Sequence, residues 1–147
     1  MREARDLALA RRQLLLAQVA RREAIAALAE AIEQEGRSAE LASRSAQLVD
    51  EYSTRPVPHL AQALREQAAF LSSLRTIHEQ ADQAHDDARD QSQWQSQALA
   101  AAQSRADRME ERTQKARRAL EQAIERRDPP VEGRVARKLH DKSDEPE

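Results

Sequence analysis

The densest cluster of side chains that could bind a metal ion lies in residues 78–87, with the sequence His-Glu-Gln-Ala-Asp-Gln-Ala-His-Asp-Asp. In a helix, His78, Asp82 and His85 would share one face, because they are spaced four and three residues apart. A metal site in a helical bundle also needs a matching ligand motif from a facing helix. The facing segment offers only separate carboxylates, at Glu30 and Glu33. We therefore interpret the cluster as a solvated polar face. We expect neither a metal ion nor a cofactor, and a helical metal-binding protein is the least favoured alternative.

Covalent catalysis has no candidate residue in this sequence. There is no cysteine and no Gly-x-Ser-x-Gly turn that would present a serine nucleophile. The chain has two glycines, which is too few for a phosphate-binding loop. We therefore expect that the protein is not an enzyme and that it acts by contact with other proteins.

Arginine dominates the basic side chains and gives the first candidate for such a contact. Arg105, Arg108 and Arg112 are three and four residues apart, so a helix would carry them on one face. Guanidinium groups form forked hydrogen bonds with carboxylates, and these three residues are predicted to dock on an acidic protein surface. Nucleic acid is not an expected partner, because the net charge is −2 and aromatic residues make up 2% of the chain.

Trp94 is the single tryptophan and stands among glutamines, in Gln-Ser-Gln-Trp-Gln-Ser-Gln. Tryptophan is enriched among the residues that dominate protein interfaces, which favours a contact role. The same side chain could instead cap the packed seam between two helices, and both interpretations stay open.

Composition predicts the elements that must carry these residues. Of 147 residues, 39% are hydrophobic and 34% charged, and half of the hydrophobic ones are alanine. Ala, Glu, Lys, Leu and Arg together exceed half of the chain, which is typical of long helices and coiled coils. Two glycines and five prolines are too few for the turns of a β or α/β fold. No apolar run approaches the length of a membrane span. The predicted fold class is all-α.

Two prolines, Pro56 and Pro58, interrupt the helical pattern near its middle. They predict helices over residues 3–53 and 57–127, folded back as an antiparallel coiled-coil hairpin because the linker is short. The hairpin would occupy residues 1–130, and residues 131–147 would form a flexible C-terminal tail.

The predicted seam of the hairpin follows apolar residues at alternating three- and four-residue steps. A short linker sets the register, with Leu48 near Ala63 and Leu41 near Phe70. The second helix then extends beyond the first and leaves its last turns unpaired from Met109 to Arg127. The seam of the first helix is predicted to contain Ile25, Leu28, Ile32, Ala39, Ala42, Ala46 and Val49. The predicted partner-binding residues are Arg105, Arg108, Met109, Arg112, Leu120, Ile124 and Trp94.

Several segments together carry a family resemblance. The first predicted helix ends in Leu48-Val49-Asp50-Glu51-Tyr52, and the second contains an Ala-Phe-Leu-Ser-Ser-Leu-Arg-Thr-Ile segment at residues 69–77. These segments are followed by the glutamine-rich stretch with tryptophan, by Met109-Glu110-Glu111-Arg112 and by Glu125-Arg126-Arg127. Over about residues 5–130 the chain resembles FliJ, the small stalk protein of the flagellar type III export apparatus. It is similar, more remotely, to the injectisome stalk of the YscO type.

The resemblance implies a cytoplasmic protein that is peripherally associated with the inner membrane through its partners. Its paired helix ends would enter the pore of the hexameric export ATPase and stimulate that enzyme. It would also contact the cytoplasmic domain of the export gate and bind export chaperones. An unrelated coiled-coil scaffold or chaperone is the alternative, and an injectisome stalk of the YscO type is the second.

Overall fold

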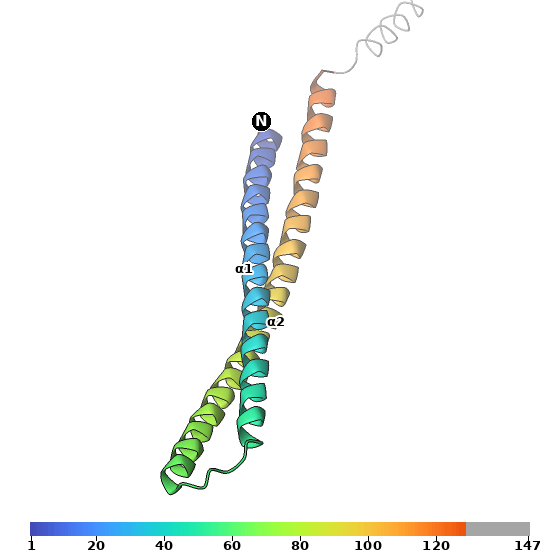
Figure 1. The fold of residues 1–147 in the computed structure, drawn as a ribbon. Coiled ribbons are helices and arrows are strands. Elements are labelled where there is room, and N and C mark those ends of the chain that lie inside the picture. Colours follow the sequence, from blue (N-terminus) through green and yellow to red (C-terminus); the bar gives the residue numbers. More distant parts are fainter. Residues whose placement is uncertain (129–147) are drawn as a thin grey trace, which may run out of the picture. The chain divides into compact units, whose positions relative to one another are not determined.

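The computed structural model describes residues 1–128, which form two long helices joined by a loop (Figure 1). Helix α1 is Arg2–Ser53 and helix α2 is Ala61–Arg127. The helices pack against each other as a hairpin, which confirms the predicted all-α fold class. None of the described helices is long and apolar enough to cross a membrane. The predicted tail at residues 131–147 lies outside the described residues.

The loop is longer than the sequence predicts, although α1 ends at Ser53 as expected. The Thr54 amide donates to the Asp50 carbonyl at 3.2 Å, so the helical hydrogen-bond pattern extends one residue past Ser53. Helix α2 begins at Ala61 and not at residue 57. Val57 precedes Pro58, and a residue before a proline is driven out of helical backbone angles. The second proline therefore delays the start of α2.

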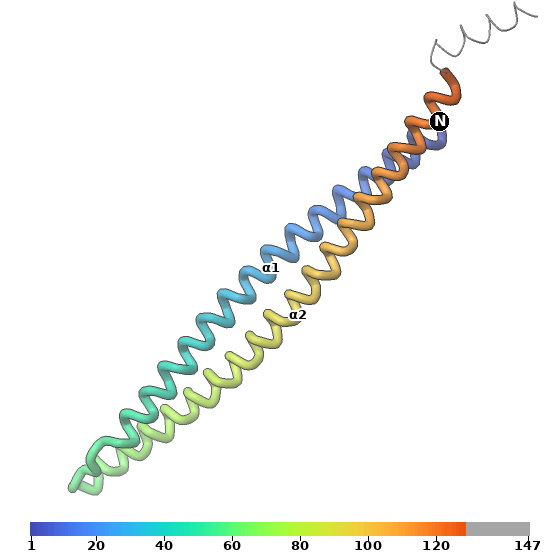
Figure 2. The backbone as a smooth tube through the Cα atoms, turned by 90° about the vertical axis from the view of Figure 1, so that its right-hand side faces the viewer, coloured from blue at the N-terminus to red at the C-terminus, as the bar shows by residue number. Residues whose placement is uncertain are grey.

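The chain divides into two compact units, and each contains a part of both helices. The first unit consists of residues 1–20 with residues 103–128, where the start of α1 lies beside the end of α2 (Figure 2). The second unit consists of residues 21–102, where the remainder of α1 runs antiparallel to the first part of α2.

The seam of the second unit is a heptad pattern of mostly small residues. It differs from the predicted seam at Ile25 and Ile32, which are 49% and 56% exposed. Ala42 is buried as predicted. Small side chains let two helix axes approach closely, and the larger aliphatic residues are left on the flanks. The buried residues of this seam are Ala31, Ser38, Ala42 and Ser45 from α1, and Leu74, Ala81, Ala88 and Ser92 from α2.

The register of the hairpin differs from the predicted one by twelve residues of α2. Ser45 contacts His78, whereas the predicted pairing of Leu48 with Ala63 would have placed Ser45 beside Glu66. The predicted pairing of Leu41 with Phe70 is wrong for the same reason, because the Phe70 ring contacts Tyr52. Helix α2 starts four residues later than predicted, and residues 61–69 precede the position at which Phe70 meets Tyr52 at the end of α1.

The first unit is packed through Leu7, Ala10, Ala17 and Ala106, all of which are buried. The predicted overhang from Met109 onward is wrong. Met109 is half-buried and lines a hollow together with Gln13 and Leu16 of α1. Farther along α2, Ala116 lines a second hollow together with Ala10. The shifted register thus places α2, as far as Ala119, beside the first turns of α1.

Candidate functional site

A groove between the two helices of the first unit is the candidate functional site, and we call it the basic groove. It consists of two adjoining hollows of about 380 and 150 Å3, which share Arg112. Helix α1 contributes leucines to the groove and α2 contributes cations. The residues that line the groove include Leu9, Gln13, Leu16, Arg105, Arg112 and Lys115.

The cations of the basic groove lie along one face of α2. Arg105, Arg108, Arg112 and Lys115 are spaced three, four and three residues apart, and all four are exposed. None of them forms an ion pair with a carboxylate among the described residues, where the ion pairs join Arg37 to Glu33 and Arg117 to Glu121. Their charge is therefore free to attract an acidic group.

The leucines of the basic groove lie along the facing side of α1. Leu9 and Leu16 are separated by seven residues, or two helical turns, and therefore lie on the same side of the helix. They are 50% and 63% exposed. Arg12 lies between them, three residues after Leu9 and four before Leu16. Apolar and cationic surfaces are thus combined on one side of the first unit.

The structure brings together only part of the predicted partner-binding set. Arg105, Met109 and Arg112 line the same hollow, and Arg108 is exposed on the same face of α2. Leu120 is half-buried, so it is not the free contact residue that an overhang would have supplied. Ile124 is half exposed near the end of α2.

Trp94 belongs to the second unit and is 60% exposed. It is therefore not buried in the seam, and most of its surface is available for contact with a partner. Sequence reasoning missed Leu9, Leu16 and Lys115 as groove residues. The seven-residue spacing of the two leucines was a usable signal for their common face.

The end of the second unit near the loop carries an aromatic cluster. The rings of Tyr52 and Phe70 meet edge to face, with centroids 4.8 Å apart. The guanidinium carbon of Arg55 lies 3.8 Å from the centroid of the Tyr52 ring, at cation–π distance. Tyr52 thus contacts both Arg55 of the loop and Phe70 of α2. Phe70 remains about half exposed.

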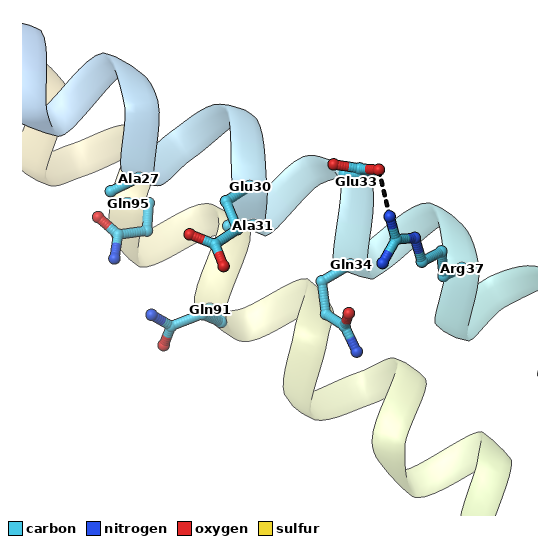
Figure 3. Close-up of a pocket in the computed structure, with 8 residues that line it drawn as sticks. All are labelled: Ala27, Glu30, Ala31, Glu33, Gln34, Arg37, Gln91 and Gln95. Atoms are coloured by element: carbon cyan, nitrogen blue, oxygen red, sulfur yellow. Dashed lines mark hydrogen bonds and ion pairs between the residues drawn. The ribbon is translucent and has the colours of Figure 1, made fainter.

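A second groove, of about 670 Å3, lies between α1 and α2 in the second unit (Figure 3). In Figure 3, Glu30 and Gln34 extend from α1, and Gln91 and Gln95 extend from α2. Its lining contains no serine, threonine, cysteine, lysine or histidine side chain.

The predicted metal-ligand candidates His78 and His85 both lie in the second unit. Nδ1 of His78 lies 3.1 Å from the Ser45 hydroxyl. Among the described residues, no group of three or more histidine, aspartate or glutamate side chains is placed to hold a metal ion.

Comparisons with family models, with curated proteins and with solved structures found no match to this chain.

Proposed function

We propose that this chain is a stalk protein of the flagellar type III export apparatus that contacts and stimulates the hexameric export ATPase. It links the ATPase to the cytoplasmic domain of the export gate, binds export chaperones and carries out no chemistry of its own. The observation that supports the proposal best is the basic groove on a two-helix hairpin, where Arg105, Arg108 and Arg112 have no described acidic partner. The resemblance of the chain to FliJ supplies the identity of the partners.

A groove of this kind acts by binding a partner protein. Unpaired cations steer an acidic partner toward the groove, and their effect falls as salt screens the charges. Adjacent apolar side chains then add contact area that does not depend on salt. A protein with this arrangement can position a partner enzyme and change its rate without a catalytic residue of its own.

The test is hydrolysis of ATP by the cognate export ATPase in the presence of the chain. Replacing Arg105, Arg108 and Arg112 by glutamate should remove most of the stimulation while circular dichroism shows unchanged helicity. The matched control is Arg65→Glu with Arg75→Glu in the second unit, which should leave stimulation intact. Unchanged stimulation by the triple variant would contradict the assignment of the contact to the basic groove.

Complementation separates the flagellar from the injectisome stalk. The gene should restore swimming to a strain that lacks its flagellar stalk protein, and it should not restore injectisome secretion to a strain that lacks the YscO-type stalk. The reverse result would support the injectisome alternative.

A coiled-coil scaffold that self-associates is the second candidate, and a separate observation favours it. Leu41, Leu48, Phe70 and Ile77 are large apolar residues that remain 37% to 56% exposed in the second unit. Sedimentation equilibrium distinguishes the two functions. A stable dimer that fails to stimulate the ATPase would support the scaffold.

A further inference from the structure

The basic groove combines two features that the packing of a two-helix hairpin does not require. The first is the exposure of Leu9 and Leu16, because burying a leucine is favourable and these two face solvent. They lie two turns apart, so one helix placed along the groove would contact both of them. The second feature is the row of cations on α2.

The charges are distributed unevenly along the groove. The hollow at Leu16 is lined by Arg105 and Arg112 and by no carboxylate. The hollow at Leu9 contains Glu3 and Asp6 as well as cations. An occupant of complementary charge is therefore acidic at the end that meets Leu16 and close to neutral at the end that meets Leu9.

We infer that the basic groove binds an acidic amphipathic helix of a partner protein, with the apolar face of that helix on Leu9 and Leu16 and its carboxylates on Arg105, Arg108 and Arg112. This inference deepens the proposed function and rests on it only for the identity of the partner. Leucines of the partner at a spacing of three and four residues would fill the two hollows. Each carboxylate beside an arginine would form a charge-assisted hydrogen bond.

The other ligands of a basic surface fit this groove less well. Phosphates of a nucleic acid would meet Glu3 and Asp6, and the exposed leucines would have no base edge or aromatic ring to contact. Insertion into an anionic membrane surface needs a broad apolar face. On α2 the apolar Met109 is half-buried against α1, so the face offered is narrow.

The test uses the full chain and two synthetic helical peptides, each four turns long and labelled with a fluorophore. Both carry leucines at positions i, i+3, i+4 and i+7, and their flanking positions are glutamate in one peptide and lysine in the other. We expect fluorescence anisotropy to show binding of the acidic peptide, weakening as salt is added, and no binding of the lysine peptide. Equal binding of both peptides, or binding of neither, would overturn the inference.

Matched variants locate the binding site. Leu16→Gln and Arg112→Glu should each weaken binding of the acidic peptide by about tenfold. The control for the leucine is Leu15→Gln, because Leu15 is also 63% exposed but does not line either hollow. The control for the arginine is Arg118→Glu, an exposed position that also lies outside the groove. Binding that falls equally in the groove variants and in their controls would overturn the inference.

Vesicles of anionic phosphatidylglycerol form the last arm of the experiment. If the chain binds these vesicles through Arg112 and Leu16 and does not bind the acidic peptide, the groove is a membrane contact and the inference is wrong. The peptide assay contains no export component. Its failure leaves the stalk function open, whereas failure to stimulate the ATPase, with peptide binding intact, rejects the stalk function alone.

Discussion

The Ser45 hydroxyl lies 3.1 Å from Nδ1 of His78, and this contact between α1 and α2 defines the register of the second unit. Ser45 is buried and also donates to the carbonyl of Ala42 at 2.8 Å. Nδ1 of the half-buried His78 has this partner only in the observed register, because sliding either helix would move it away from Ser45.

The register can be checked with pairs of cysteines. Ser45→Cys with His78→Cys should form a disulfide within one chain on mild oxidation, because these side chains face each other across the seam. Leu48→Cys with Ala63→Cys, the pair that a shorter loop would bring together, should not. Non-reducing electrophoresis after proteolysis between the two sites gives the readout, and the opposite outcome would restore the shorter loop.

The sequence predicts the fold class and most helix ends because these depend on local chemistry. Two prolines stop α1 close to Ser53, and the long alanine-rich segments form helices without competition from turn residues. The seam depends on the choice between neighbouring apolar stripes of α1. One stripe contains Ile25 and Ile32, and the other contains Ala31 and Ser38. Residue size favours the first stripe, but close approach of the helices selects the second.

The candidate site was predictable only in part for the same reason. Arg105, Arg108 and Arg112 are on one face in any register, because that face is a property of α2 alone. The residues of α1 that lie across from them depend on the pairing of the helices. A register shift of twelve residues changes which residues of α1 face these arginines. The sequence alone therefore does not identify Leu16 as a neighbour of Arg105 and Arg112.

Leu74 and Ile77 provide a matched test of the seam. Leu74 is 8% exposed and Ile77 is 51% exposed, although they are three residues apart on α2. Leu74→Ala should lower the free energy of unfolding by about 2–3 kcal/mol, because it removes a buried side chain and leaves a cavity. Ile77→Ala should cost about 1 kcal/mol or less. Urea denaturation measures both, and equal losses would contradict the assignment of the seam.

Gly36 lies inside α1, and a methyl group added at its Cα would meet nothing within 4 Å. Its backbone angles are those of an ordinary helical residue, because no described glycine has a positive φ. Gly36→Ala should therefore raise the free energy of unfolding by about 0.5–1 kcal/mol through the lower entropy of the unfolded chain. The control is Ala29→Gly, an exposed position on the same helix, which should lower stability by a similar amount. A loss of stability in Gly36→Ala would contradict the open surroundings of this position.

The Ser92 hydroxyl donates to a carboxylate oxygen of Glu35 across the same seam, at 2.5 Å. Ser92 is buried and Glu35 is half-buried, so the carboxylate has limited access to water. Ser92→Ala should lower the free energy of unfolding by about 1–2 kcal/mol, because the charged acceptor loses its partner. In a Glu35→Ala background the same change should have almost no effect, because no charge is left to satisfy. A double-mutant cycle measured by urea denaturation gives the coupling energy directly. Additive effects would show that water satisfies the Glu35 carboxylate and that this contact contributes nothing to the choice of register.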